Sequence, residues 1–485
     1  MFEEAESDPR LSKEHVQAQE ERLRTALLKA QYGRLQRGER SLLIVVAGLD
    51  GAGKGATVNL LNEWMDPRHI RTLAFGPPTP EEAARPPMWR YWNELPPRGR
   101  TGIVFGSWYG PLLCEAARKH PDTEALEARA EAVRRFEATL AGDGVQILKL
   151  WFHLSRKAQR ERAERLLASR DTAWQVSPAD LAVHRRFGRL RRAGQLAIEH
   201  TQAAHAPWLV IPSADDELRT LRTAEAVLHA LRHPPAPPPV ARPAARRVPD
   251  RLAAIDHGAR LDKEEYEASL PAWQGKLARQ VRRKKFAGRS LILVFEGQDA
   301  AGKGGTIRRV TPAFDVRRVG LFPISAPAPY ERARPYLWRF WRQVPAPGHI
   351  AIFDRSWYGR VLVERVERLT RPADWRRAYG EINDFEAQLA EHGAIVLKFW
   401  LAVTPEEQLA RFREREQSPF KSFKITEEDW RNRSKRDDYA QAANEMLVRT
   451  DTAHAPWHVL SSDDKRHARV EVVRRIAQAL EKALD

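Results

Sequence analysis

The sequence of 485 residues contains a single cysteine, Cys114. One cysteine can form neither an intrachain disulfide nor a zinc site of several thiolates, so the disulfide-stabilised class of secreted proteins is excluded. No apolar run approaches the roughly 20 residues of a membrane-spanning helix. The first ten residues, MFEEAESDPR, are polar and acidic and lack the apolar segment of a secretory signal. We therefore expect a cytoplasmic protein with no membrane partner.

The composition is that of a globular protein with an excess of positive charge. Hydrophobic residues make up 42% and charged residues 30% of the chain, which is enough apolar material for sizeable cores. The chain has 81 Lys and Arg against 64 Asp and Glu, a formal net charge of +17. Such an excess predicts attraction to a polyanion, which can be a nucleic acid, an anionic membrane or a phosphate-rich small molecule.

The chain contains the same unit twice. Lys54 and Lys303 are 303 − 54 = 249 residues apart, and each follows a glycine-rich turn. The same offset relates the SWYG motifs at 107–110 and 356–359, the pairs Phe136-Glu137 and Phe385-Glu386, the pairs Leu148-Lys149 and Leu397-Lys398, and the HAPW motifs at 205–208 and 454–457. The register holds without a gap over about 41–215, which indicates a duplicated domain.

The two copies are separated by a proline-rich segment. Residues 233–250 are rich in Pro, Ala and Arg, a composition typical of a semi-rigid, solvated linker. We therefore predict an N-terminal domain at 1–232, which we call the first repeat, and a C-terminal domain at 251–485, which we call the second repeat.

Each repeat has the pattern of a parallel α/β domain. In the second repeat, apolar runs at 290–297, 349–354, 394–403 and 457–460 are separated by long charged helical stretches. Continuous apolar runs are typical of strands that are buried on both faces. Strands that alternate with helices predict a mainly parallel sheet with helices on both sides, so the fold class is α/β with two tandem domains.

The glycine-rich turns fit the phosphate-binding loop pattern GxxxxGK. The two copies read GLDGAGK (48–54) and GQDAAGK (297–303), each between a predicted strand and a predicted helix. Glycines allow backbone N–H groups to surround a phosphate, and the lysine reaches its oxygens. Gly304 follows the lysine, where Ser or Thr would otherwise bind Mg²⁺. We therefore assign phosphate binding to Gly297, Gly302, Lys303 and Gly304, and favour Asp299 as a metal or phosphate-site residue.

A second group of charged residues follows the strand at 349–354. Asp354 ends this strand, which is the usual place for an acid that binds Mg²⁺ beside a phosphate loop, and Arg355 and Arg360 follow it. Cations at this place can stabilise the charge on a transferring phosphoryl group. At the same offset the first repeat has Phe105, Gly106 and Pro111. We interpret Trp108 and Trp357, which both copies retain, as packing residues.

A basic segment at 418–439 is typical of a lid that closes over a phosphoryl-transfer site. We predict that its cations bind phosphate, namely Lys421, Lys424, Arg431 and Lys435. The first repeat has Thr172 in place of Lys421 and Ala182 in place of Arg431. The first repeat therefore lacks both the strand-end charges and much of the lid.

The motifs FEGQDAAGKGG, FDRSWYGRVLVERVE, WRNRSKRDDY and TDTAHAPW together resemble the type-2 polyphosphate kinase family. This resemblance implies a thymidylate-kinase-like P-loop fold and Mg²⁺-dependent phosphate transfer between inorganic polyphosphate and nucleotides. The tandem architecture and Gly359 resemble the subgroup that phosphorylates AMP to ADP. The resemblance places Lys303 and Asp299 in the phosphate loop, Asp354 and Arg355 beside Mg²⁺, and Arg431 and Lys435 in the lid.

The sequence therefore predicts a Mg²⁺-dependent polyphosphate:nucleotide phosphotransferase with its working site in the second repeat. The predicted catalytic residues are Lys303, Asp299, Asp354, Arg355 and Arg360, and the predicted metal ligands are Asp299 and Asp354. The expected partners are inorganic polyphosphate and AMP rather than nucleic acid, because the aromatic residues do not alternate with a basic patch. Alternatives are a polyphosphate-dependent kinase of nucleoside diphosphates, an ATP-dependent small-molecule kinase, and a polyanion-binding protein without catalysis. The sequence leaves the oligomeric state open, a homo-oligomer included.

Overall fold

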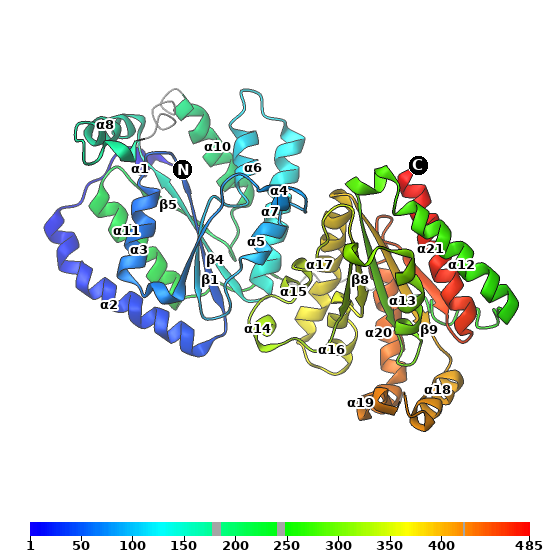
Figure 1. Ribbon diagram of the computed structural model, residues 1–485. Coiled ribbons are helices and arrows are strands. Elements are labelled where there is room, and N and C mark those ends of the chain that lie inside the picture. The colour runs from blue at the N-terminus through cyan, green and yellow to red at the C-terminus, as the bar shows by residue number, and fades with distance from the viewer. Residues whose placement is uncertain (177–185, 240–247, 421) are drawn as a thin grey trace. The chain divides into compact units, whose positions relative to one another are not determined.

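The computed structural model describes residues 1–176, 186–239, 248–420 and 422–485 (Figure 1). The chain divides into two compact units. The first comprises 1–78, 90–239 and 328–336, and the second comprises 79–89, 240–327 and 337–485. Part of the predicted linker, 240–247, lies outside the described residues.

Each unit contains one five-stranded sheet, and every strand pair is parallel. The strand orders are β2-β3-β1-β4-β5 and β10-β9-β6-β8-β7, so the strand before each glycine-rich turn is central. The strands are β1 (Ser41–Gly48), β2 (Ile70–Ala74), β3 (Thr101–Phe105), β4 (Val145–His153), β5 (Trp208–Pro212), β6 (Ser290–Gly297), β7 (Val319–Pro323), β8 (Ile350–Asp354), β9 (Ala394–Ala402) and β10 (Trp457–Ser461). The predicted parallel α/β fold of two tandem domains is confirmed.

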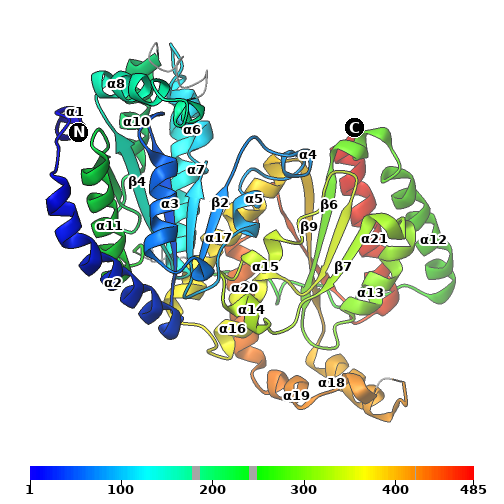
Figure 2. The ribbon, with the colours of Figure 1, turned by 60° about the vertical axis from the view of Figure 1, so that its left-hand side comes forward.

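Helices cover both faces of each sheet (Figures 1 and 2). In the first repeat they are α1 (Glu3–Glu6), α2 (Lys13–Arg37), α3 (Lys54–Trp64), α4 (Pro80–Ala83), α5 (Trp89–Asn93), α6 (Gly110–Ala116), α7 (Thr123–Gly142), α8 (Arg156–Leu167), α10 (Phe187–Thr201) and α11 (Asp216–Arg232). In the second repeat they are α12 (Lys263–Gln280), α13 (Lys303–Val310), α14 (Pro329–Arg332), α15 (Trp338–Trp341), α16 (Val363–Val366), α17 (Pro372–Glu391), α18 (Pro405–Gln417), α19 (Glu427–Ser434), α20 (Arg436–Arg449) and α21 (Lys465–Leu484). None of the helices in the described part of the chain has an apolar stretch long enough to cross a membrane.

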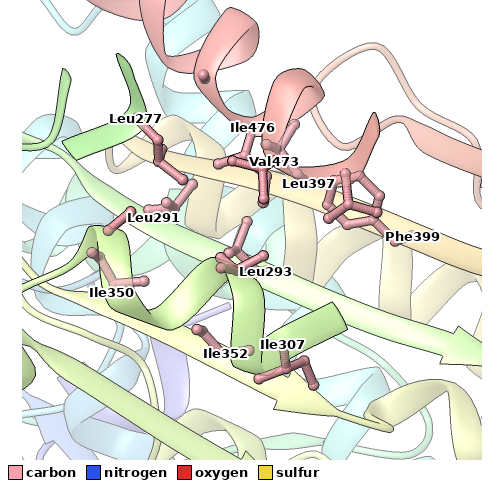
Figure 3. Packing of buried hydrophobic residues seen from close by; sticks show 14 of the residues in the cluster. Leu277, Leu291, Leu293, Ile307, Ile350, Ile352, Leu397, Phe399, Val473 and Ile476 are labelled. Atoms are coloured by element: carbon pink, nitrogen blue, oxygen red, sulfur yellow. The ribbon is translucent and has the colours of Figure 1, made fainter. Parts of the chain in front are cut away.

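The core of the second repeat fixes the strand that carries the phosphate loop. Alternate residues of β6, such as Leu291 and Leu293, are fully buried and face Val473 and Ile476 of α21 (Figure 3). Ile307 of α13 joins the same cluster. Each large apolar side chain buried in this way contributes about 1.5–3 kcal/mol. The glycine-rich turn between β6 and α13 is therefore attached to rigid structure at both ends.

The sequence pattern missed the fifth strand of each repeat, represented by β7 in the second. This strand lies at the edge of the sheet and pairs only with β8. Its sequence is VGLFP, and none of its five residues is fully buried. A short, half-exposed edge strand that contains Gly and Pro lacks the continuous apolar run that marks a central strand.

The Trp-Tyr-Gly motif is held by a buried ion pair in both repeats. In the second repeat Lys398 Nζ lies 2.7 Å from Glu386 Oε2, and both side chains are 0% exposed. Trp357 Nε1 and Tyr358 Oη donate hydrogen bonds to Glu386 Oε1 at 3.0 and 2.7 Å. The first repeat has the same contacts among Lys149, Glu137, Trp108 and Tyr109, at 2.8, 3.0 and 2.8 Å. The packing interpretation of Trp108 and Trp357 therefore holds, with a polar anchor added.

Candidate active site

The phosphate loop of the second repeat curls around its own lysine. Gly297 ends β6, Gly302 is the N-cap of α13, and Gly304 is the second residue of that helix. Lys303 donates from Nζ to the carbonyl oxygens of Gly297, at 2.8 Å, and Gln298, at 3.0 Å. The N-terminus of α13 thus faces the loop with free N–H groups and partial positive charge, which suits a phosphate.

Asp299 is anchored inside this loop by two partners. Arg355 donates to Oδ1 at 2.6 Å and Asn432 of α19 donates to Oδ2 at 2.8 Å. Burial raises the pKa of Asp299, but Lys303, Arg355 and the hydrogen bond from Asn432 outweigh it and hold the pKa below its usual value. Asp299 is therefore ionised, and its carboxylate links the phosphate loop to Arg355 at the end of β8 and to Asn432 in the lid.

Asp354 lies at the carboxyl end of β8, beside the start of α13. Its Oδ2 would be 3.8 Å from a Cβ atom placed on Gly304. Across the described ranges, no hydrogen bond or ion pair occupies the Asp354 carboxylate. The absence of a side chain at Gly304 leaves this carboxylate facing the first turn of α13.

Lys303 is the centre of the charged group. Burial and the neighbouring Arg355 lower its pKa, while Asp299, Asp354 and Glu296 act in the opposite direction. Because all four side chains act electrostatically on Lys303, the structure brings together the predicted residues Lys303, Asp299, Asp354 and Arg355. Their catalytic roles stay predictions.

Arg355 has an unusual backbone conformation for a residue with a side chain. Its φ is +64°, in the left-handed region, and the matching residue in the first repeat is Gly106 at +73°. Ala300 in the phosphate loop shows the same relation, with φ +60° against +77° for Gly51. Such residues persist only where the surrounding structure imposes them, and they concentrate at functional sites.

Glu296 is a site residue that sequence reasoning missed. It is the last side chain of β6, is 4% exposed, and accepts a hydrogen bond from Ser356 Oγ at 2.8 Å. Burial raises the pKa of Glu296, with the hydrogen bond and Arg355 opposing. The first repeat has Ala47 at this position. An acid within an otherwise apolar strand, absent from the other copy, is the signal that could have identified it.

Arg360 lies against residues that follow it in the chain. Its Nε lies 2.8 Å from Glu364 Oε2, and its Nη1 donates to Thr370 at 3.3 Å. These contacts place the guanidinium beside α16, whereas Arg355 points into the phosphate loop. The catalytic role of Arg360 stays a prediction.

The predicted lid contacts the site through α19 and through Lys435, which follows that helix. Lys435 Nζ lies 2.7 Å from Glu367 Oε2, and Arg431 Nε lies 3.7 Å from the same atom. Lys424 belongs to the short helix Ser422–Lys424, and Lys421 lies outside the described residues. Glu367 and Asn432, which sequence reasoning did not single out, thus hold the lid in this structure.

Comparison with known proteins identifies the family. The family model described as Polyphosphate kinase 2 (PPK2) matches residues 10–236 and again 260–485. The chain belongs to the polyphosphate kinase 2 family. It is 47% identical to a polyphosphate:AMP phosphotransferase from Pseudomonas aeruginosa, over 100% of this chain and 99% of that protein. A polyphosphate:AMP phosphotransferase from Acinetobacter johnsonii is 40% identical over 95% of this chain and 96% of that protein.

A solved structure is also similar. A crystal structure from Pseudomonas aeruginosa, assigned to polyphosphate kinase 2, superposes with a TM-score of 0.90 at 46% identity. The match covers 100% of this chain and 99% of that chain. The tandem arrangement of two polyphosphate kinase 2 domains is therefore shared over the full length.

The first polyphosphate kinase 2 domain has a phosphate loop whose lysine is already paired. Lys54 donates to the carbonyl oxygens of Gly48 and Leu49, and also to Asp50 Oδ1 at 3.1 Å. In the second domain Arg355 holds the matching aspartate, but the first domain has Gly106 there and no guanidinium. The pairing of Lys54 with Asp50 leaves the first loop with less net positive charge toward an anion.

Proposed function

We propose that the second repeat transfers the terminal phosphate of inorganic polyphosphate to AMP and releases ADP. The observation that supports this most directly is the asymmetry between the two copies. Lys303, Asp299, Asp354 and Arg355 gather around the phosphate loop of the second repeat, while the first repeat lacks two of the four. The names of full-length relatives at 40–47% identity agree with this reaction.

The chemistry requires charge stabilisation rather than a protein nucleophile. An anionic phosphate oxygen of AMP attacks the terminal phosphorus of polyphosphate, and the bridging P–O bond to the next phosphate breaks. The shortened polyphosphate leaves with the electron pair. The attacking oxygen carries no proton at neutral pH, so no general base is needed.

The residues of the second repeat can supply this stabilisation. The N–H groups at the start of α13 and the Lys303 ammonium bind non-bridging oxygens, and Arg355 adds a second cation. The unoccupied carboxylate of Asp354 fits a Mg²⁺ ion, which prefers one or two carboxylates together with phosphate oxygens. Asp299, whose oxygens accept from Arg355 and Asn432 in this structure, is the second predicted ligand. When bound, Mg²⁺ neutralises charge on the phosphate oxygens.

The experiment compares one variant from each repeat. Purified protein is incubated with polyphosphate, Mg²⁺ and AMP, and ADP is measured. Asp354→Ala is expected to lower kcat by roughly 10²–10³-fold, the usual loss on removing one electrostatic stabiliser. Lys54→Ala is expected to change kcat less than twofold, because the first loop takes no part in the reaction.

Equal losses in both variants would contradict the assignment of the reaction to the second repeat. Replacing polyphosphate with ATP, and AMP with GMP or ADP, tests the alternative donors and acceptors. Turnover with ATP but not with polyphosphate would overturn the proposed donor. A strong preference for ADP over AMP would favour a nucleoside diphosphate kinase instead.

A further inference from the structure

Helix α21 begins with positive charges where helix electrostatics oppose them. After the N-cap Asp464, its first residues are KRHAR, with Lys465, Arg466 and Arg469 in the first turns and no acidic residue among them. The N-terminus of a helix carries partial positive charge and favours acidic side chains. The matching helix of the first repeat, α11, follows this rule and begins with Asp216 and Glu217. The cations of α21 therefore do not serve the stability of the helix.

These cations lie beside the phosphate loop of the second repeat. Helices α13 and α21 are neighbours (Figure 2). Arg469 Nη2 would be 3.3 Å from a Cβ atom placed on Gly305, while the preceding Gly304 faces Asp354. The first turn of α13 thus has Asp354 near one of its two glycines and Arg469 near the other. The first repeat has Ala56 and Thr220 in place of Gly305 and Arg469.

Helix α13 contributes two further cations to the same region. Arg308 is exposed, and Arg309 donates to the carbonyl oxygen of Gly305 at 3.3 Å. The first repeat has Asn59 and Leu60 at these positions. We call the five residues of α13 and α21 the cation strip: Arg308, Arg309, Lys465, Arg466 and Arg469. The matching positions of the first repeat carry two negative charges and no positive one.

The cation strip has fewer acidic partners than cations. Within the part of the chain that the structure describes, its one ion pair joins Lys465 to Glu414 at 3.5 Å. Burial, and to a smaller extent the nearby Arg411, lower the pKa of Lys465, while Glu414 and Glu407 act in the opposite direction. A surface with five cations and one acidic partner is built to attract an anion.

We propose that the cation strip binds the part of the polyphosphate chain that extends beyond the reacting phosphate. This inference rests on the proposed function. AMP has one phosphate and can be bound at the loop alone, whereas polyphosphate carries negative charge on every unit and needs a row of cations. Arg309 and Arg469 of the strip both lie against Gly305, in the helix turn that follows the phosphate loop. Lys465 and Arg466 precede Arg469 at the start of α21.

The composition of the strip favours polyphosphate over a nucleic acid. The sequences of the two helices, KGGTIRRV and KRHARVEVVRRIAQALEKAL, contain no Phe, Tyr or Trp. Sites for single-stranded nucleic acids combine cations with aromatic side chains on which bases stack. A chain of phosphates without bases requires the cations alone.

The test uses a double variant, Arg466→Ala/Arg469→Ala, and a matched control on the same helix. The control is Lys482→Ala, at the exposed far end of α21. ADP formation is measured with polyphosphate of about 100 units and with triphosphate. In the double variant we expect KM for the long donor to rise roughly three- to tenfold, from the loss of two charge contacts. We expect kcat and KM for AMP to stay within twofold of the wild type, and KM for triphosphate, which has only two further phosphates, to rise less than KM for the long donor.

A binding measurement makes the test independent of turnover. Labelled long polyphosphate is titrated at several salt concentrations without AMP. For each cation that contacts the chain, the slope of log K against log salt is expected to become shallower by about one. Thermal unfolding controls for folding, because removing cations from the first turns of α21 should not lower Tm.

The outcomes separate the inference from the proposed function. If the wild type makes ADP but the double variant matches Lys482→Ala in KM and salt slope, the inference is wrong. An equal rise in KM for long and short donors would also overturn it, as would a larger loss of affinity for single-stranded RNA than for polyphosphate. If the wild type makes no ADP, yet its polyphosphate binding depends on Arg466 and Arg469, the proposed function fails and the inference stands.

Discussion

Arg355 and Gly106 occupy the same left-handed backbone position in the two repeats. A residue with a side chain at positive φ costs about 1–2 kcal/mol relative to the right-handed conformation. Arg355 is held there by its N–H bond to the Phe295 carbonyl, at 3.0 Å, and by its ion pair with Asp299. Glycine adopts this conformation without that cost, so it is the more stable residue at this position where no guanidinium is present.

Two substitutions of Arg355 separate the backbone from the side chain. Arg355→Gly and Arg355→Ala both remove the guanidinium, so both are expected to lower kcat by roughly 10²–10³-fold. Glycine adopts positive φ without strain, so Arg355→Gly is expected to be more stable than Arg355→Ala by about 1 kcal/mol. Urea unfolding monitored by circular dichroism gives the difference. Equal stabilities would show that the conformation carries no strain.

The predictability of the site differed from residue to residue. Lys303, Asp299, Asp354 and Arg355 could be placed near one another because each has a fixed position relative to a strand end, and strand ends of a parallel sheet meet at one edge. Asn432 and Glu367 could not be predicted. Their contacts with Asp299 and Lys435 depend on how the lid folds back over the sheet, which local sequence patterns do not encode.

At the scale of elements, the short helix η7 (Trp357–Arg360) is fixed to α17 and β9 by the buried pair of Glu386 and Lys398. Tyr358 and Trp357 of η7 donate to Glu386, and Lys398 also donates to the Thr450 carbonyl at 2.6 Å. The same arrangement in the first repeat shows that it belongs to the fold rather than to catalysis. It determines where β8 ends and therefore where Asp354 and Arg355 lie.

Removing one partner of this pair is expected to be costly. Glu386→Gln leaves Lys398 as an uncompensated buried charge, so we expect a loss of about 3–5 kcal/mol in the free energy of unfolding. Adding Lys398→Met removes that charge and is expected to recover part of the loss. Chemical unfolding of the single and double variants measures both effects. A double variant less stable than Glu386→Gln would show that the lysine contributes more through its other hydrogen bonds than it costs through burial.

The elements themselves were predictable to different degrees. The strands β6, β8, β9 and β10 were predicted from apolar runs and were placed within one residue at every end. The edge strand β7 was not predicted, because its pattern is set by pairing with β8 rather than by burial. The buried ion pair was visible only as repeated Phe-Glu and Leu-Lys dipeptides, whose contact is brought about by the fold.

At the scale of the whole molecule, the two repeats have diverged in charge while keeping one fold. The first repeat lacks the residues that match Glu296, Asp354, Arg355 and the cation strip, and retains both the Trp-Tyr-Gly anchor and a phosphate loop. Glycine stands in place of two residues of the second repeat that have left-handed backbone, Ala300 and Arg355. The first repeat has therefore lost the charges of the site and also the strained backbone that held them.

We expect that placing Asp and Arg at positions 105 and 106 of the first repeat does not restore the site. A Cβ atom on Gly106 would clash with the carbonyl oxygen of Phe75, so the backbone has closed over the space that Arg355 uses in the second repeat. Gly106→Arg is therefore expected to lower the free energy of unfolding by at least about 1–2 kcal/mol, from the left-handed conformation alone. Phe105→Asp is the matched control, because Phe105 is 36% exposed at the end of β3 and can be replaced at small cost.

Activity of the first repeat can be measured in a protein in which the site of the second repeat is inactive. In an Asp354→Ala background, adding Phe105→Asp and Gly106→Arg is expected to give no ADP above the background, because Ala47 still replaces the buried glutamate and no lid cations match Lys421 and Arg431. Thermal unfolding should show the lower stability that the backbone clash requires. Recovery of turnover in the triple variant would contradict this prediction. It would show that Phe105→Asp and Gly106→Arg alone restore catalysis, and that the backbone of the first repeat can still form the active site.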